Sequence, residues 1–102
     1  MFCGGNEISL EVDVSNCKEL LSFECFSQIL TSLDFSNNPK LMSLRLANNK
    51  LKKLDISKNT KLEELWCTQN LLSELDVSSC LSLRTLVIAD NELTSLNVFL
   101  LA

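Results

Sequence analysis

The 102-residue sequence contains no histidine and no tyrosine, and only one tryptophan, one proline and two glycines. Without histidine it lacks the side chain that most often serves as a general base, and it lacks clustered His and Cys ligands for zinc. No Gly-x-Ser-x-Gly, P-loop or His-Glu-x-x-His motif is present. The sequence therefore predicts no enzymatic activity, no bound metal and no cofactor.

Long apolar runs and clustered basic residues are also missing. The apolar run at residues 98–102 is far shorter than the roughly 18 residues that a membrane-spanning helix needs. Nine Lys and Arg residues are scattered among thirteen Asp and Glu residues, which gives a net charge of −4. This balance argues against nucleic acid or anionic lipid as a partner and favours a protein or a neutral glycan. The first residues show no secretion signal.

What the sequence has instead is repetition. Residues 41–51 match the pattern LxxLxLxxNxL at every fixed position, and residues 62–72 and 83–93 match it with Cys67 and Ile88 at the third leucine. A second pattern, LxxLDxS, lies between these blocks. The repeating unit is therefore 21 residues long, because successive blocks start alternately 10 and 11 residues apart, at residues 20, 30, 41, 51, 62, 72, 83 and 93.

This pattern resembles the leucine-rich-repeat family, and specifically the bacterial subclass with a nested 21-residue period, also called IRREKO-type. The resemblance implies a right-handed solenoid of the α/β leucine-rich-repeat superfamily. Here we expect mostly parallel β-strands with little or no helix, since blocks of about ten residues leave no room for a packed helix. The resemblance also implies a parent protein that is secreted or on the bacterial cell surface, although the residues themselves leave the compartment open.

We expect residues 1–102 to form one leucine-rich-repeat domain of about four to five coils. Both ends lie in mid-repeat without a recognisable polar cap, so we expect either a piece of a longer receptor-like or adhesin-like protein or end-to-end association of copies of the chain. Each LxxLxLxxN block should form a strand, and each LxxLDxS block a second, shorter parallel sheet or an extended segment. Two ladders of inward amides should bond to backbone groups at the corners: Gln28, Asn49, Asn70 and Asn91 in one, and Asn38 and Asn59 in the other.

The five cysteines also follow the repeat. Cys25 and Cys67 occupy the third-leucine position, and Cys17 and Cys80 occupy the asparagine position of the second block. Stacking separates these two pairs by about 10 and 14 Å, beyond the roughly 7 Å between Cα atoms that a disulfide tolerates. We therefore predict small buried hydrophobic side chains. A bridge between Cys3 and Cys25, which are neighbours in one column, stays open as an alternative.

One acidic column recurs every 21 residues. Stacked carboxylates repel one another unless each accepts hydrogen bonds, and a serine follows two residues after each aspartate. A capping ladder is the favoured interpretation, and a cation-binding strip is the alternative. The column consists of Asp13, Asp34, Asp55 and Asp76, with Asn97 completing it.

The outward positions of the strands form the candidate binding surface. Aromatic and Arg side chains dominate binding hot spots, so Trp66 and Arg45 are its main candidates. The alternative is that Trp66 only packs between neighbouring strands. The predicted function is a non-catalytic protein-interaction module that presents a concave parallel-strand face to a protein or peptide; the alternative is a structural spacer or adhesin segment of a larger bacterial surface protein. The predicted partner-binding residues are Glu24, Phe26, Arg45, Trp66 and Val87.

Overall fold

The computed structural model describes residues 2–4, 14–26, 30–93 and 95–97. None of these residues is helical, as the repeat length predicted. No helix in this part of the chain is long and apolar enough to span a membrane. The described strands are β1 (Phe2–Gly4), β2 (Ser22–Phe26), β3 (Ser43–Arg45), β4 (Glu64–Trp66), β5 (Glu74–Asp76), β6 (Thr85–Val87) and β7 (Ser95–Asn97).

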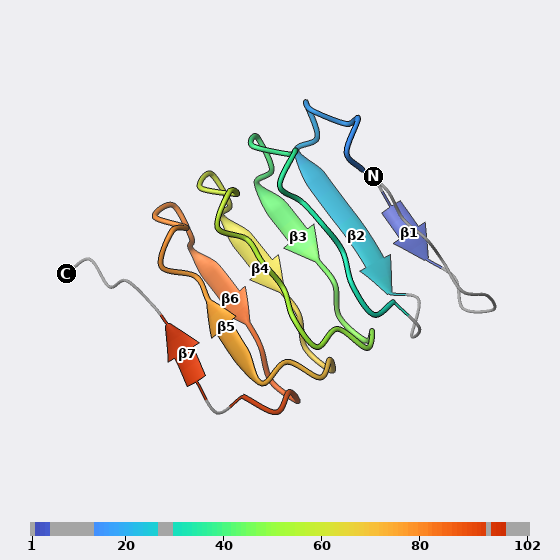
Figure 1. Ribbon diagram of the computed structural model, residues 1–102, viewed down its shortest axis with the longest axis vertical. Helices are drawn as coiled ribbons and strands as arrows, with labels where there is room; N and C mark the ends of the chain where they lie inside the picture. Colours follow the sequence, from blue (N-terminus) through green and yellow to red (C-terminus); the bar gives the residue numbers. More distant parts are fainter. Residues whose placement is uncertain (1, 5–13, 27–29, 94, 98–102) are drawn as a thin grey trace.

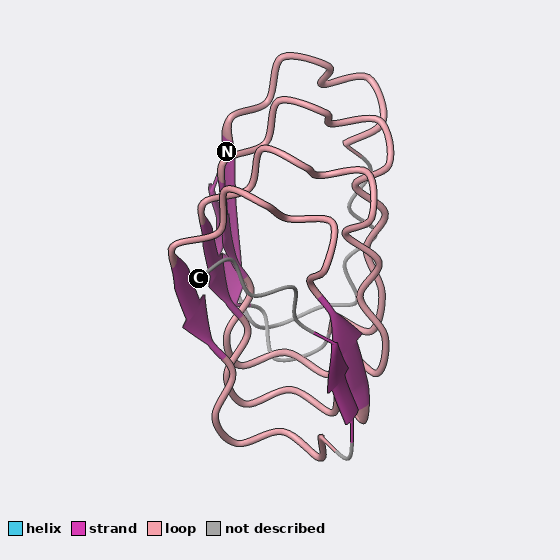
Figure 2. Ribbon diagram, turned by 90° about the vertical axis from the view of Figure 1, so that its left-hand side faces the viewer, coloured by secondary structure: helices cyan, strands magenta, loops and turns pink. Residues whose placement is uncertain are grey.

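The strands form two parallel sheets on opposite sides of a flattened coil (Figure 2). The larger sheet has the order β1-β2-β3-β4-β6, with its strands side by side in Figure 1, and the smaller sheet pairs β5 with β7. Leu44 lies opposite Leu65, which lies opposite Leu86, so residues one repeat apart are stacked. Between β1 and β2 the step is one residue longer, with Phe2 opposite Glu24. This parallel stack is the solenoid-like fold that the repeat predicted.

The core consists of the repeated leucines. Leu44 and Leu65 are completely buried, while the residues on either side of each are at least partly exposed, which is the alternation of a sheet with one buried face. Truncation of such a leucine to alanine typically destabilises a protein by about 2–5 kcal/mol. The same core contains an edge-to-face pair between Phe23 and Phe35, whose ring centroids are 5.4 Å apart.

The second block of the repeat forms a paired strand in one coil and an unpaired segment in another. In the described part of the chain, residues 74–76 form β5 and pair with β7, whereas residues 53–56 are extended without being assigned to a strand. Leu54 and Ile56 are nevertheless buried and Asp55 is exposed, so the alternation persists without a ladder. Both predicted forms, a short parallel sheet and an extended segment, are therefore present.

Reverse turns at one corner of each coil are joined by a column of side chains, which we call the turn ladder. At its centre the Asn59 amide donates hydrogen bonds to the carbonyl oxygens of Phe35 and Asn38 in the preceding coil, each at 3.0 Å. Asn38 donates in the same way to its own preceding coil. In the next coil the Cys80 thiol points at the equivalent oxygens of Ile56 and Asn59, at 3.8 and 3.5 Å. The turn ladder consists of Cys17, Asn38, Asn59 and Cys80.

A strand-end ladder occupies the other corner. The Asn70 amide donates to the carbonyl oxygens of Leu46 and Cys67 at 2.9 and 3.0 Å, and its oxygen accepts the Leu51 N–H at 3.1 Å. The residue before each ladder asparagine has a positive φ, which the sequence did not lead us to expect: 62° at Asn48, 56° at Gln69 and 60° at Asp90. The ladder consists of Asn49, Asn70 and Asn91, which confirms the predicted role of the amides; Gln28 lies outside the described residues.

The cysteines confirm one prediction and correct another. Cys67 is completely buried, and burial raises the pKa of its thiol to about 12, so it remains an uncharged hydrophobic group. Burial, followed by the charge of Asp76, also raises the pKa of the Cys80 thiol. Cys17, however, is exposed, so its predicted burial was wrong. Cys25 is buried opposite Cys3 in the register; the Cys3 side chain lies outside the described part, so the alternative of a bridge between them is not tested.

Asn59→Ala tests the turn ladder. We expect the free energy of unfolding to fall by about 2–4 kcal/mol, because two buried carbonyl oxygens lose their donor. Chemical denaturation measures this change. The matched control is Asn37→Ala, at an exposed turn position, for which we expect a change within about 0.5 kcal/mol. Equally small effects of both variants would contradict the structural role of the ladder.

Candidate functional site

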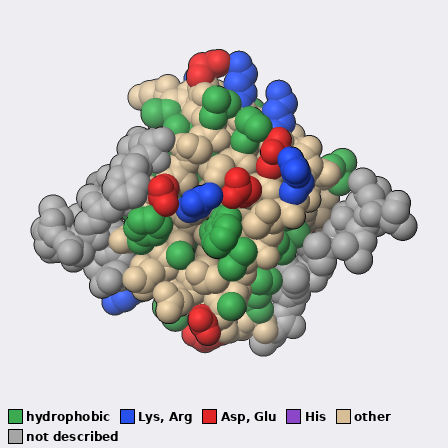
Figure 3. All heavy atoms as spheres, turned by 180° about the vertical axis from the view of Figure 1, so that it is seen from behind, with side chains coloured by type: hydrophobic (Ala, Val, Ile, Leu, Met, Phe, Trp, Pro, Cys, Tyr) green, Lys and Arg blue, Asp and Glu red, His purple; other side chains and the backbone are tan. Residues whose placement is uncertain are grey.

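Four of the predicted binding residues lie in one row across the larger sheet. The register places Glu24 opposite Arg45, Arg45 opposite Trp66, and Trp66 opposite Val87, with one residue from each of β2, β3, β4 and β6. Each is next to a core-facing residue on its strand, so its side chain points outward. We call the outward side chains of these four strands the strand face. Figure 3 views the molecule from this side, with acidic, basic and hydrophobic groups adjoining near the middle.

At the centre of the strand face, Arg45, Glu64 and Trp66 form a cluster. The Arg45 guanidinium lies over the indole, 5.3 Å from the ring centroid. The same carboxylate oxygen of Glu64 accepts a hydrogen bond from the Trp66 indole Nε1 at 3.1 Å and from an Arg45 Nη2 at 3.3 Å. Arg45 and Glu64 keep 47% and 38% of their side-chain surface exposed. The cluster therefore fixes a partly exposed indole in place while it remains in contact with solvent.

Glu64 was not among the predicted binding residues. Glu64 is half-buried and is bonded to both hot-spot candidates. The signal was available in the strand period, because residues 64 and 66 project from the same side of one strand. Glu63 makes a looser contact, at 3.8 Å, with Arg84, which is 79% exposed.

The remaining predicted residues surround this cluster. Glu24 and Val87 are half-buried at the two ends of the row, and Phe26 is half-buried two residues further along β2. At the beginning of the strands, Leu21 and Met42 expose 55% and 39% of their surface. The structure thus brings Glu24, Phe26, Arg45, Trp66 and Val87 onto one surface. Binding by these residues stays a prediction.

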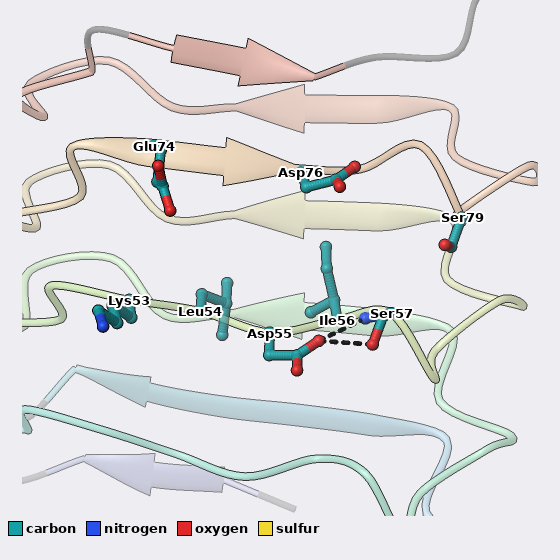
Figure 4. Close-up of a pocket in the computed structure, with 8 residues that line it drawn as sticks. All are labelled: Lys53, Leu54, Asp55, Ile56, Ser57, Glu74, Asp76 and Ser79. Atoms are coloured by element: carbon teal, nitrogen blue, oxygen red, sulfur yellow. Dashed lines mark hydrogen bonds between the residues drawn. The ribbon is translucent and has the colours of Figure 1, made fainter.

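The aspartate column lies on the other side of the coil. Asp55 accepts hydrogen bonds from the side chain and the backbone N–H of Ser57 at 2.7 and 2.9 Å (Figure 4). Asp76 is bonded to Ser78 in the same way. These bonds, with the side-chain bond the stronger influence, lower the pKa of both carboxyl groups below the ordinary value. The bonds support the capping interpretation; Asp13 lies outside the described residues.

A hollow of about 230 Å³ lies between the second blocks of two successive coils (Figure 4). Its lining includes the buried side chains of Leu54 and Ile56, and the other lining residues are polar and exposed, apart from the half-buried Ser79. Within the described ranges, no group of three or more His, Cys, Asp or Glu residues is arranged to hold a metal ion. The hollow is open to solvent and lies across the coil from the strand face. Its lining residues are Lys53, Leu54, Asp55, Ile56, Ser57, Glu74, Asp76 and Ser79.

Comparison with known proteins yields one informative likeness. No family model matches the sequence, and no curated protein matches it. The structure is similar to that of the functional domain of InlJ from Listeria monocytogenes, which includes a cysteine ladder, with a TM-score of 0.75 and 30% sequence identity. The match covers 82% of this chain and 19% of that chain, so this chain spans about a fifth of the InlJ domain. With the parallel stack described above, this likeness shows a leucine-rich-repeat-like fold.

Ser57→Ala tests the capping bond. We expect the pKa of the Asp55 carboxyl to rise toward its ordinary value, as measured by carbon NMR during an acid titration. Since the folded-state pKa is depressed, the associated stability is present above the unfolded-state value near 3.9 and is lost as the pH falls through the folded-state pKa. Ser79→Ala, which removes a nearby hydroxyl without a bond to Asp55, should leave that pKa unchanged. An unchanged pKa in Ser57→Ala would refute the cap.

Glu64→Ala tests whether this carboxylate fixes the indole. We expect the Trp66 fluorescence to shift to longer wavelength and its indole N–H signal in NMR to exchange faster with water, because the hydrogen bond at 3.1 Å is lost. Trp66 is the only tryptophan, so both signals are unambiguous. The control is Glu63→Ala, which removes the carboxylate of the residue directly before β4. An identical response of both variants would show that Glu64 does not position the ring.

Proposed function

We propose that this chain is a non-catalytic protein-interaction module that binds a protein or peptide through its strand face. The observation that carries the proposal is the indole of Trp66, which is held by Glu64 and Arg45 and still partly exposed. A rigid aromatic group supplies contact area and loses little conformational entropy on binding. The proposed contact residues are Glu24, Phe26, Arg45, Trp66 and Val87.

The surrounding surface supports this proposal. Exposed Leu21 and Met42 add apolar area at one end of the strands, while Glu24 and Arg45 add charge that orients a partner. The described coils are joined to their neighbours by backbone hydrogen bonds and by asparagine side chains, which favours a stiff scaffold. Such a surface binds with little rearrangement.

We further assign the chain to the bacterial 21-residue leucine-rich-repeat subclass with a right-handed coil. The register steps of 21 residues along β2, β3, β4 and β6 and the likeness to InlJ support this assignment. A leucine-rich-repeat neighbour also favours a binding role over an enzymatic one.

The second candidate function is a structural spacer or adhesin segment of a larger surface protein. The observation that favours it is the internal satisfaction of the Trp66 cluster, since its three side chains bond to one another without a partner. In a spacer these contacts would serve only to link neighbouring strands.

A displayed library of random dodecapeptides separates the two functions. The chain is immobilised and selected clones are retested against Trp66→Ala and against Lys53→Ala, which alters the opposite side of the coil. For an interaction module we expect enriched clones that bind at least about tenfold more weakly to Trp66→Ala, since hot-spot truncations lose roughly 1.4 kcal/mol or more.

The control variant should bind those clones as tightly as the unmodified chain. The spacer would be favoured if Trp66→Ala and Lys53→Ala weakened the binding of equal numbers of clones. It would also be favoured if the selection enriched no clone. Thermal unfolding of both variants checks that each remains folded.

A further inference from the structure

The strand face carries one carboxylate that none of the described residues neutralises. Glu24 is half-buried at the centre of β2, and its carboxylate makes no hydrogen bond or ion pair with any residue that the structure describes. Its neighbour in the sheet is Arg45, the obvious counter-charge. A carboxylate of this kind, beside a cation that does not contact it, is a site for a positive group from another molecule.

Arg45 is unavailable to Glu24 because its guanidinium is engaged on the other side. It donates to Glu64 at 3.3 Å and lies 5.3 Å above the Trp66 ring, and both of those residues belong to β4. The two contacts reinforce each other, since Glu64 also accepts from the indole. Turning Arg45 toward Glu24 would break the hydrogen bond to Glu64 and remove the cation from the ring.

The net charge of the sheet also favours a basic partner. Among the residues of β2, β3, β4 and β6 the only charged side chains are Glu24, Arg45 and Glu64, so the strands carry a net charge of −1. Because Arg45 and Glu64 neutralise each other, that charge resides at Glu24. The whole chain carries −4, which further attracts a basic partner and repels an acidic one.

We propose that Glu24 and Trp66 form a two-point site for an extended polypeptide segment, with a Lys or Arg side chain bound at Glu24 and an apolar side chain on the Trp66 indole. This inference rests on the proposed function and specifies the chemistry of the partner. Glu24 and Trp66 lie two strands apart, on β2 and β4, which corresponds to about 10 Å. In the polyproline II conformation, which has three residues per turn and a rise of about 3.1 Å per residue, residues three apart lie on the same side of the segment and about 9 Å from each other, which sets the spacing of the basic and apolar residues.

Among the described residues, small side chains lie on both sides of this site. Ser22 and Ser43 lie beside the Glu24–Arg45 row on one side, and Ala47 lies beside it on the other. Phe26, two residues further along β2, is placed to contact the aliphatic stem of a bound Lys or Arg. An acidic segment is disfavoured, since it would have to displace Glu64 from Arg45 and would face Glu24.

The test uses the acetylated octapeptide STKTSLTS, whose Lys and Leu are three residues apart, and two versions in which Gln or Glu replaces the Lys. Each is titrated into the unmodified chain while the Trp66 indole signal is followed by NMR. We expect the Lys peptide to bind about three- to tenfold more tightly than the Gln peptide, the Glu peptide to bind most weakly, and the preference to shrink as salt increases.

Glu24→Gln should abolish the preference for the Lys peptide, and Glu24→Lys should reverse it in favour of the Glu peptide. The matched control is Glu74→Gln, an exposed glutamate on β5, which should preserve the preference. Equal binding of the three peptides, no binding of any, or the same loss in Glu74→Gln would overturn the inference. The proposed function is judged separately, by whether library clones depend on Trp66 whatever their charge.

Discussion

The structure depends on one recurring hydrogen bond, from a buried asparagine amide to carbonyl oxygens of the preceding coil. Each coil turns its backbone away from the sheets at two corners, where carbonyl groups would otherwise be buried without donors. Asn59 at one corner and Asn70 at the other satisfy these groups one repeat earlier. Because the donor and the acceptors belong to different coils, the bond sets the stacking register as well as the turn. The leucines add the apolar driving force, but leucine burial alone excludes a slip of one residue more strongly than a slip of two, which keeps the same side chains on the inner face.

That register determines what the surface can present. With 21-residue steps, Arg45 lies directly beside Trp66, and Glu64, two residues before Trp66, projects from the same side. Three side chains from two strands then form a cluster that neither strand can form alone. The same step places Glu24 beside Arg45. The Arg45 guanidinium does not serve as its counter-charge, however, because the indole and Glu64 together hold it over β4. The binding properties proposed for this chain are thus a product of its period.

The sequence predicted what the period controls and missed what depends on particular side-chain geometry. Stacked leucines, inward asparagines and capped aspartates all follow from position in the repeat, and the structure confirms them for Leu65, Asn70 and Asp55. The role of Glu64 depends on which of two nearby partners an arginine selects, which spacing cannot show. Cys17 shares a column with buried Asn38 and yet is exposed, because burial depends on the neighbouring coils as well as on the position within the repeat.

The scaffold and the proposed binding surface are formed by different positions of the same strands. In β4 the central Leu65 is fully buried, while Glu64 and Trp66 on either side reach the surface. Substituting the outward residues would therefore alter the proposed recognition surface without removing the leucines or asparagines that hold the stack. Outward positions that are one repeat apart carry different residues, and the central row of the strand face contains Glu, Arg, Trp and Val. The inward positions remain almost constant from coil to coil. A repeat that fixes its interior so strictly and leaves its exterior so varied is suited to recognition, because specificity can be built from neighbouring, independently chosen side chains.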